Sequence, residues 1–510
     1  MAEFERREKH AGERIMHIGD LMAETGVKFG TSGARGRVED MTDLVCYAYA
    51  QGFLRHLLGA GALSVGADIG LAGDYRASTA RILGACAKAV SDCGCTAHYL
   101  GRLPTPAVAA YGIAQGWPTM MVTGSHIPDD RNGIKFNLRS GEILKADEEG
   151  IRAQQIELPD GLFDAAGAFT DPQHSALPPE NPAALEHYIA RYLDFFPADW
   201  LAGLRIGLYE HSSVARDALF RVLTGLGAEV ERLGFSETFL PVDTEAIRAE
   251  DIALARDWAA DGRLAALVST DGDGDRPLVG DERGEWLRGD IAGVLCAQAL
   301  GATAVVTPIS SNTALEASGW FSETVRTRIG SPYVIAGMQS LSARGIAPVV
   351  GYEANGGFLT DSDIEREGHV LPALPTRDAV IVAVTLIGAA RAHQQPLSAL
   401  AKSLPQRFTY SDRLKEFPTT LSAERFAAFQ TGDLAADRAA LDQVFSAEFG
   451  PVAEVDQTDG IRMTLASGDI LHLRPSGNAP ELRAYTEADS PERARSLNQR
   501  CLAILEGWRS

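Results

Sequence analysis

Short apolar runs alternate with longer stretches of helical spacing along most of this chain. Runs at 64–71, at 97–100 and ending at Val122 have the length and composition of buried strands. Between them, residues 41–58 and the alanine-rich segment that ends at Val90 carry apolar side chains at helical spacing. Strands that alternate with helices of about ten or more residues are typical of α/β folds. The pattern therefore predicts an α/β domain that follows a polar, mostly helical lead-in over residues 1–27.

The same alternation continues further along the chain. A second set of elements is predicted as a helix at 184–195, strands at 204–209, 229–233 and 264–269, and a helix at 216–226. A third set has a strand at 304–307, a helix that starts at 310–312, a strand at 347–350 and a helix at 377–390. Because ligands bind outside the carboxyl ends of strands in open α/β sheets, the glycine-bearing polar loops after these strands could converge on one cleft.

Two lapses in the pattern divide the chain. Between 158 and 183 it gives way to Asp, Pro, Gly and Ala, and between 402 and 418 the apolar positions thin out again. The residues that remain mix helices with strands at 460–466 and 470–474, which fits a small α+β domain. We therefore predict four domains after the lead-in, at 28–180, 181–291, 292–402 and 403–510.

The composition is that of an ordinary globular protein, with 45% hydrophobic and 23% charged residues among 510. The formal net charge of -21 argues against nucleic acid or an anionic membrane as a partner, unless a local basic cluster overrides it. Six cysteines are sparse for this length and lack the paired spacing of a zinc site, which predicts reduced thiols. The longest apolar run, 379–390, is too short to span a bilayer, so we expect a cytoplasmic protein.

The first candidate for chemistry is Ser125. The run that ends at Val122 is followed by residues too rich in Gly, Pro, Asp and Asn to continue a strand, which predicts an exposed serine on a tight turn. An isolated Gly-Ser is more often a helix-capping serine at the surface. An esterase nucleophile would need Gly two residues later, where this chain has Ile127. We expect His126, as a direct neighbour, to point away from Ser125 and to orient the turn.

Three aspartates, Asp271, Asp273 and Asp275, follow the strand predicted at 264–269. Carboxylates are hard ligands that suit Mg²⁺ or Ca²⁺ rather than Zn²⁺. A calcium-hand loop would need Gly at its sixth position and an entering helix, whereas this segment has Arg276 there and a preceding strand. A purely structural acidic turn is the simpler alternative, but three carboxylates this close repel one another unless a cation neutralises them.

A glycine-rich segment at 28–36, Lys-Phe-Gly-Thr-Ser-Gly-Ala-Arg-Gly, can bring backbone N–H groups and the Arg35 guanidinium to an anion. Alone, such a segment is more often a flexible turn. A serine on a turn, an acidic loop of the magnesium kind and scattered arginines together favour phosphoryl transfer, because positioning and charge neutralisation supply most of its catalysis. Ser125 would then carry the phosphate.

Four segments of the chain are of interest together: Thr-Gly-Ser-His-Ile-Pro at 123–128, Asp-Gly-Asp-Gly-Asp-Arg at 271–276, the loop around Glu353, and Arg-Pro-Ser-Gly at 474–477. In their order and separations they resemble the four signature loops of the α-D-phosphohexomutases. The segment at 29–36 fits the N-terminal signature of the same family. The resemblance implies an α/β fold of three related domains with mixed sheets and a C-terminal α+β domain like the TATA-binding protein, heart-shaped around a central cleft.

The resemblance also implies the catalytic roles. Ser125 would be the phosphoserine, and one of its phosphate oxygens would bind Mg²⁺ together with the three aspartates Asp271, Asp273 and Asp275. Lys135 matches the lysine that acts as general acid/base. Arg35 and Arg276 would stabilise the transferring phosphoryl group.

The substrate contacts implied by the resemblance lie in two later loops. Glu353 and Asn355 would hold sugar hydroxyls, which a carboxylate can do in both orientations of the sugar. The phosphate that is not being transferred would be held by residues of the last domain: Arg474, Ser476, Gly477, Asn478 and Arg483. A clamp built from charge and backbone N–H groups binds a phosphate whichever carbon bears it.

The implied reaction interconverts a hexose 6-phosphate and a hexose 1-phosphate through a hexose 1,6-bisphosphate that turns end for end. We expect mannose as the hexose, with some activity on glucose phosphates, in a monomer or homodimer.

The chain departs from the family pattern at Asn355, where serine is common and where asparagine also occurs in the acetylated amino-sugar branch. N-acetylglucosamine or glucosamine phosphate is therefore the first alternative. Asn478 and Ala479 also replace the usual Thr and Glu, and the glycine-rich turn expected around 210–213 is missing. The alternative from another class is a non-catalytic sugar-phosphate sensor, although a pure binder needs no phosphorylatable serine.

Overall fold

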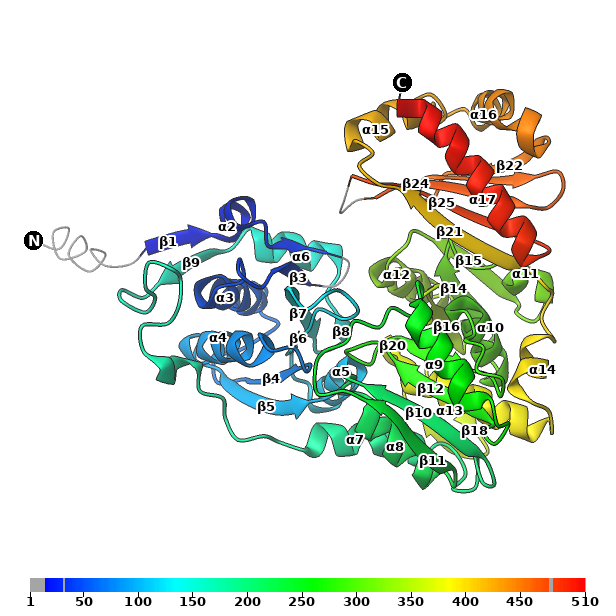
Figure 1. Ribbon diagram of the computed structural model, residues 1–510. Helices are drawn as coiled ribbons and strands as arrows, with labels where there is room; N and C mark the ends of the chain where they lie inside the picture. Colours follow the sequence, from blue (N-terminus) through cyan, green and yellow to red (C-terminus); the bar gives the residue numbers. More distant parts are fainter. Residues whose placement is uncertain (1–13, 31–32, 477–479, 510) are drawn as a thin grey trace, which may run out of the picture. The chain divides into compact units, whose positions relative to one another are not determined.

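The computed structural model describes residues 14–30, 33–476 and 480–509. The chain forms two compact units, one built from Met1–Gly289 and Asn355–Leu397, the other from Asp290–Ala354 and Ser398–Ser510. We describe each unit by itself (Figure 1).

The first sheet of the first unit has seven strands, six of them in the order β2-β3-β7-β6-β4-β5. Its strands are β2 (Lys28–Phe29), β3 (Ala34–Arg37), β4 (Asp68–Gly73), β5 (Thr96–Arg102), β6 (Thr119–Val122) and β7 (Arg131–Leu138), and β8 (Gly141–Glu142) pairs with β7. Strands β4, β5 and β6 are parallel, whereas β7 runs antiparallel to β6. The sheet is therefore mixed.

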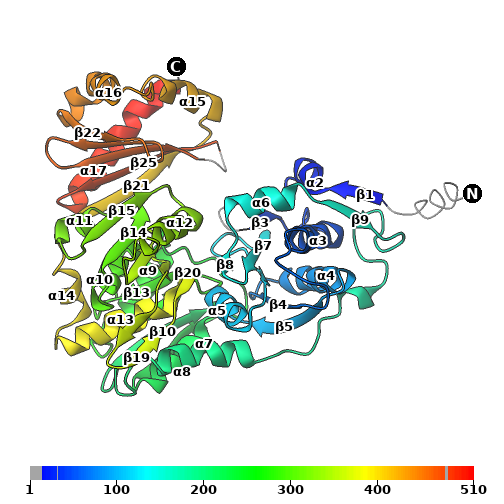
Figure 2. The ribbon, with the colours of Figure 1, turned by 180° about the vertical axis from the view of Figure 1, so that it is seen from behind.

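Three helices cover this sheet. Helices α3 (Asp43–Gly59) and α4 (Thr79–Asp92) lie together on one face, and α5 (Thr105–Gln115) lies on the other, as both ribbon views show (Figures 1 and 2). Their apolar side chains and those of the strands form one buried core. A small antiparallel pair, β1 (Arg14–His17) with β9 (Gln155–Leu158), and the helices α2 (Ile18–Thr25) and α6 (Lys145–Arg152) complete this part of the chain.

The second sheet of the first unit has the order β11-β10-β12-β13. Its strands are β10 (Arg205–His211), β11 (Glu229–Phe235), β12 (Ala266–Thr270) and β13 (Pro277–Gly280), with helices α7 (Ala183–Leu193), α8 (Arg216–Gly225) and α9 (Ala249–Ala259). Strands β10, β11 and β12 are parallel, and β13 returns antiparallel to β12. The acidic segment at 271–276 forms the connection between β12 and β13.

The remaining elements of the first unit come after residue 355. They are β17 (Phe358–Thr360), the hairpin of β18 (Ile364–Arg366) and β19 (His369–Leu371), β20 (Leu374–Asp378) and α13 (Ala379–Ala392). Helix α13 is buried on all sides, and the side chain of Asp378 caps its first turn by accepting from the Val380 amide. The hydroxyls of Tyr188 and Tyr192 on α7 also donate to Asp378, which fixes α13 to the rest of the unit.

The second unit begins with a parallel set of strands, β14 (Ala304–Pro308) between β15 (Glu323–Thr327) and β16 (Val349–Tyr352). Its helices are α10 (Gly289–Ala299), α11 (Ala314–Ser318), α12 (Ser331–Ser342) and α14 (Leu397–Ala401), the first and last of which begin in the first unit.

The C-terminal part is an antiparallel sheet in the order β21-β25-β24-β23-β22. Its strands are β21 (Phe408–Leu414), β22 (Val452–Asp456), β23 (Ile461–Leu465), β24 (Ile470–Pro475) and β25 (Leu482–Ala488). Helices α15 (Thr419–Ala427), α16 (Leu434–Phe449) and α17 (Pro491–Glu506) pack on it around a core of its own. The predicted α/β class with a closing α+β domain is confirmed.

The apolar pattern of the sequence did not predict two of the strands. Strand β7 lies in the polar segment after Ser125, and β21 lies within the lapse at 402–418. Both strands contain charged or polar residues and lack a long apolar run. They are strands because each pairs with its neighbours in the sheet. All six cysteines are free thiols, as predicted. Among the described residues, no helix combines the length and apolar character needed to cross a membrane.

Candidate active site

Ser125 lies in the segment that connects β6 to β7, which together with the first residue of β7 we call the serine loop, residues 123–131. Its backbone has φ of 55°, a left-handed conformation that non-glycine residues adopt rarely and that clusters at functional sites. The predicted exposure is wrong, because only 1% of Ser125 is accessible to solvent. The reason is that the loop between β12 and β13 covers it, as the contact between Ser125 and Asp271 shows.

The hydroxyl of Ser125 has two polar neighbours. It donates to Asp271 Oδ2 at 2.6 Å, and His126 Nδ1 lies 3.2 Å from the same oxygen. The expectation that His126 points away is therefore wrong, because the left-handed turn at Ser125 brings the two side chains to the same side. The nearby Arg276 charge, together with burial, lowers the pKa of His126 to about 3, so the imidazole is neutral at physiological pH.

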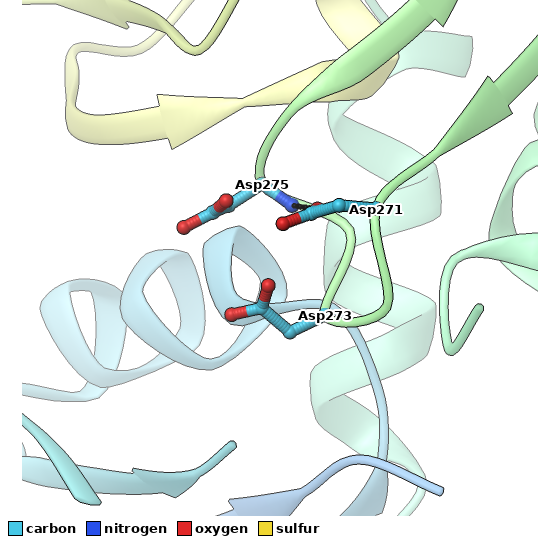
Figure 3. A group of neighbouring side chains, drawn as sticks. All are labelled: Asp271, Asp273 and Asp275. Atoms are coloured by element: carbon cyan, nitrogen blue, oxygen red, sulfur yellow. Dashed lines mark hydrogen bonds between the residues drawn. The ribbon is translucent and has the colours of Figure 1, made fainter. Parts of the chain in front are cut away.

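The acidic loop, residues 270–276 and here called the metal loop, brings its three carboxylates together. Figure 3 shows Asp271, Asp273 and Asp275 turned toward the same side of the loop. All three are fully buried, and one oxygen from each lies within 4.8 Å of the others. The amides of Asp275 and Arg276 both donate to Asp271 Oδ1 at 3.2 Å, and Gly274 makes the turn with φ of 74°. The preceding strand β12 agrees with the rejection of a calcium-hand loop.

Cationic side chains hold two of the carboxylates. Lys135 Nζ on β7 lies 2.7 Å from Asp273 Oδ2 and 2.5 Å from Asp275 Oδ2. Arg377 on β20 donates to Asp275 Oδ2 through Nη2 at 2.9 Å and through Nε at 3.1 Å. Burial opposes the charge of Lys135, but the two aspartates raise its pKa above the ordinary value. Burial and the neighbouring Asp273 and Asp275 raise the pKa of Asp271.

The donor set fits a hard divalent cation. Oδ1 of Asp273 and Oδ1 of Asp275 are buried and have no hydrogen-bond partner among the described residues. A buried carboxylate oxygen without a partner costs free energy that a bound cation removes. The Lys135 ammonium already bridges two of these carboxylates, which shows that the cluster accommodates a positive charge. The three aspartates therefore suit Mg²⁺ or Ca²⁺.

Three guanidinium groups lie beside the carboxylates. Arg276 Nε is 3.9 Å from Asp271 Oδ2 and 3.8 Å from Asp275 Oδ1, and it has no hydrogen-bond partner among the described residues. Burial and the charges of Arg276 and Arg377 lower the pKa of Arg35 to about 10. Lys135 is a fourth cation beside the three carboxylates, and Asp243 also acts on Arg276. Guanidinium and ammonium groups gathered in this way can stabilise an anion such as a phosphoryl group.

Three residues of this site were missed from the sequence. Arg377 binds Asp275, and Arg76 donates to the Ser125 carbonyl at 2.9 Å. Thr105 donates its hydroxyl to Asp273 Oδ2 at 2.7 Å and its amide to the Asp273 carbonyl at 2.9 Å. Arg76 could have been proposed from the sequence, because it lies in the polar segment Gly-Asp-Tyr-Arg-Ala-Ser at 73–78, directly after a predicted strand. Arg377 and Thr105 carried no signal, because their role depends on contacts between distant elements.

Glu353 and Asn355 lie just after β16, Glu353 as a buried residue of the second unit and Asn355 as the first residue of the first unit's later segment. The Asn355 carbonyl accepts from Thr244 Oγ1 at 2.7 Å, and its side-chain oxygen accepts from the Gly357 amide at 2.9 Å. The Asn355 side chain is thus oriented by its own turn.

The C-terminal sheet places three arginines in register. Arg474 on β24 lies directly opposite Arg483 on β25, which lies opposite Arg413 on β21. We call these three residues the arginine row. Like charges in opposite positions destabilise a sheet. Glu481 pairs with Arg413 and Arg483, Asp459 pairs with Arg474, and Tyr485 also interacts with Arg483. Arg483 Nε is buried without a hydrogen-bond partner among the described residues. Such a row suits an anion.

The loop after the arginine row is described only in part. Ser476 is buried, and its amide donates to the Glu481 carbonyl at 2.9 Å. Gly477 and Asn478 lie outside the described residues, as do Thr31 and Ser32 of the glycine-rich segment. Arg474 also lines a polar cavity of about 240 Å³ together with Arg328, Tyr333 and Asp459.

Comparison with known proteins places this geometry in context. The chain matches three models of the phosphoglucomutase/phosphomannomutase family: α/β/α domain I over residues 26–158, α/β/α domain III over 288–408, and the C-terminal domain over 428–504. It is 44% identical to a phosphomannomutase of Sinorhizobium fredii, over 94% of this chain and 99% of that one. It is 41% identical to a phosphomannomutase of Salmonella muenchen, over 97% and 98% of the two chains.

A solved structure has the same fold. The crystal structure of a phosphoglucomutase/phosphomannomutase family protein from Burkholderia thailandensis superposes with a TM-score of 0.71 and covers 95% of this chain and 98% of its own. The identity between the two chains is only 18%.

Proposed function

The chain belongs to the phosphoglucomutase/phosphomannomutase family, and from this premise we propose that it is a phosphomannomutase that interconverts mannose 6-phosphate and mannose 1-phosphate. The observation that carries the proposal is the buried contact between the Ser125 hydroxyl and Asp271, within a cluster of three carboxylates. The identity of 41% to 44% to two phosphomannomutases over nearly the whole chain supports mannose as the sugar.

In this proposal Ser125 carries the phosphoryl group between two sugar hydroxyls. The bond between Ser125 Oγ and phosphorus breaks as a bond from the sugar hydroxyl oxygen to phosphorus forms, which yields a hexose 1,6-bisphosphate. Ser125 Oγ gains a proton, and the sugar hydroxyl loses one. The bisphosphate turns, and the reverse step returns its other phosphoryl group to Ser125.

The surrounding side chains suit this transfer. His126 Nδ1 and Asp271 Oδ2 are within hydrogen-bond distance of Ser125 Oγ, so both can exchange a proton with it. Lys135, kept as an ammonium by Asp273 and Asp275, is the candidate proton donor of the acid/base pair. The guanidiniums of Arg35 and Arg276 neutralise charge on the transferring group.

Mg²⁺, held by Asp271, Asp273, Asp275 and a phosphoserine oxygen, would supply charge neutralisation and orientation at the phosphoryl group. The residues themselves bring the oxygens together and exclude water, since all three carboxylates are fully buried. A hexose 1,6-bisphosphate would prime the enzyme by phosphorylating Ser125.

Arg474, Ser476, Gly477, Asn478 and Arg483 would hold the phosphate that is not transferred, and Glu353 and Asn355 would hold the sugar hydroxyls. Guanidinium groups bind phosphate from either carbon of the sugar. We also propose a cytoplasmic enzyme, monomeric or homodimeric, with domains at 28–180, 181–291, 292–402 and 403–510.

A coupled assay with mannose, glucose, glucosamine and N-acetylglucosamine phosphates tests the sugar. We expect the highest kcat/KM with mannose phosphates and some turnover of glucose phosphates. Asn355 is the observation that favours an amino sugar instead, because an amide can bond to an acetamido group. Equal or better turnover of either amino sugar would contradict the mannose assignment.

A further inference from the structure

The segment between β11 and α9, residues 236–248, contacts several loops of the active site. We call it the strap. Its Leu240 amide donates to Ser212 Oγ at 2.7 Å, and Thr244 Oγ1 donates to the Asn355 carbonyl. Asp243 Oδ1 accepts from the amides of Glu245 and Ala246, which fixes the turn. These bonds hold the strap at Leu240 and Thr244, and Phe239 directly precedes Leu240.

Arg76 is a buried cation that binds the backbone of the serine loop. Its guanidinium donates to the backbone carbonyls of Ser125 at 2.9 Å and Ile127 at 2.6 Å, and to those of Pro128 at 2.8 Å and Arg131 at 3.1 Å. Asp74 accepts from its Nε. Four carbonyls of one loop thus depend on the position of a single guanidinium.

Phe239 lies flat against this guanidinium. The Cζ atom of Arg76 is 3.9 Å from the centroid of the Phe239 ring, within the range of a cation–π contact. Both groups are nearly inaccessible to solvent, with exposed fractions of 1% for Arg76 and 7% for Phe239. A desolvated contact of this kind is worth more than an exposed one.

The same ring also contacts the metal loop. A Cβ added at Gly272 would lie 2.9 Å from Phe239 Cε2 and 2.9 Å from the Ser125 carbonyl oxygen. Gly272 therefore packs closely against both the ring and the backbone of Ser125. The ring contacts the guanidinium that holds Ser125 and the loop that carries Asp271 and Asp273.

We propose that Phe239 is a positioning residue that sets the placement of Ser125 relative to the metal loop. By holding Arg76 against the serine loop and Gly272 against Ser125, the ring keeps Ser125 Oγ at the carboxylate cluster. The inference rests on the proposed phosphoryl transfer for its effect on rate, but its structural part does not. A mutation far from the reacting atoms that displaces a catalytic group by about 1 Å can lower the rate by ~10²-fold.

The test compares Phe239→Leu with Phe220→Leu. Leucine keeps an apolar side chain of similar volume but removes the aromatic face. Phe220 on α8 is the control, because its ring also makes a cation–π contact: Arg232 on β11 lies over it at 4.7 Å. No contact of the Phe220 ring with the serine loop or the metal loop is found among the described residues. Two quantities are measured in the full-length protein: single-turnover phosphoryl transfer from the phosphorylated enzyme to mannose 6-phosphate, and hydrogen exchange of the amides at 123–131 and 270–276.

We expect Phe239→Leu to slow single-turnover transfer by about 10- to 100-fold, while the mannose 6-phosphate concentration that gives half of the maximal single-turnover rate stays within about twofold. Amide exchange in both loops should be faster by about tenfold or more, because the local opening free energy falls. Phe220→Leu should change neither quantity.

Exchange in Phe239→Leu that matches wild type and Phe220→Leu would overturn the inference. So would a transfer rate within about twofold of wild type in a folded variant. A wild-type protein that transfers no phosphoryl group to any sugar would contradict the proposed function, whereas the exchange comparison would still decide the role of Phe239.

Discussion

The carboxylate cluster of the first unit and the arginine row of the second unit use charge in opposite ways. The side chains of Asp271, Asp273 and Asp275 have no solvent exposure and are surrounded by cations. The arginine row sets like charges opposite one another, and its side chains are 21% to 46% exposed. In our proposal both regions bind phosphate, but only the first one makes and breaks a bond.

The difference follows from what each region must do. Developing charge on a transferring phosphoryl group is stabilised most by fixed, desolvated groups, because a low local dielectric strengthens each interaction. A clamp that must release one end of a sugar bisphosphate and accept the other gains from partial solvent exposure, which weakens each contact. The two regions should therefore respond differently to mutation, one in kcat and the other in KM.

The largest effect is expected from Ser125→Ala. Removing the acceptor of the phosphoryl group should lower mutase turnover by more than about 10⁴-fold, because no other route to the bisphosphate is available. Sugar-phosphate binding, measured by calorimetry, should change by less than about threefold, since the contacts to the distal phosphate remain. Ser91→Ala, at an exposed position on α4, is the control. Turnover that survives in Ser125→Ala would rule out the covalent carrier.

Asp273→Asn should have the next largest effect. The substitution removes one charge from the proposed metal ligands and leaves Lys135 and Thr105 with a weaker partner. We expect at least about tenfold more Mg²⁺ for half-maximal activity and a kcat lower by ~10²-fold. Asp261→Asn, an exposed aspartate of the same sheet domain, serves as the control. An unchanged Mg²⁺ titration would remove Asp273 from the metal site.

Arg474→Ala tests the arginine row, the second of the two regions compared. Loss of a charge-assisted contact to phosphate costs about 1.5–3 kcal/mol, which predicts a KM higher by about 10- to 100-fold. The kcat value should fall far less than in Asp273→Asn. Arg438→Ala on α16 is the control, since that arginine is exposed and its side chain donates to the Ala453 carbonyl at 3.3 Å. A variant with normal KM and low kcat would assign Arg474 to the chemical step instead.

The smallest effect is expected from pH acting on buried histidines. Burial lowers the pKa of His472, next to the arginine row, to about 4, against an ordinary value of 6.5. The unfolded chain then binds more protons than the folded one between these values, so stability is full above about pH 6.5 and falls as the pH drops toward 4. His472→Gln should reduce this loss, as measured by urea unfolding at pH 7.5 and pH 5. If the free energy of unfolding of the variant depended on pH in the same way as that of the wild type, the lowered pKa of His472 would be contradicted.

The sequence predicted the fold well where apolar periodicity was strong. The strand before the metal loop and the helices α3, α7 and α8 lie within a few residues of their predicted ranges. It failed for β7, which is rich in polar residues and is a strand because of its partners in the sheet. It also failed for the burial of Ser125, which depends on a loop almost 150 positions away along the chain, as the contact with Asp271 at a separation of 146 residues shows.

The candidate site was predicted from short sequence motifs rather than from the spacing of apolar residues. The three aspartates and Ser125 came from their chemistry, while Lys135 and Arg35 needed the family resemblance. Arg377, Thr105 and Phe239 had no local signal, because each acts through a contact that only the folded chain creates. The turn at 210–213, which lacks the expected glycines, now has a physical role. His211 Nε2 lies 2.8 Å from the Thr270 carbonyl, and Ser213 Oγ bonds Thr270 Oγ1 at 2.6 Å, so this turn supports the metal loop.

The central claim is that Ser125 carries the phosphoryl group, and peptide mass spectrometry tests it most directly. The full-length protein is incubated with Mg²⁺ and a hexose 1,6-bisphosphate, digested and sequenced by fragmentation. The account predicts one added phosphate, located on Ser125, that disappears when a hexose monophosphate is added in excess. A protein that acquires no phosphate, or acquires it on another residue, would contradict the account and would favour a non-catalytic sugar-phosphate-binding protein.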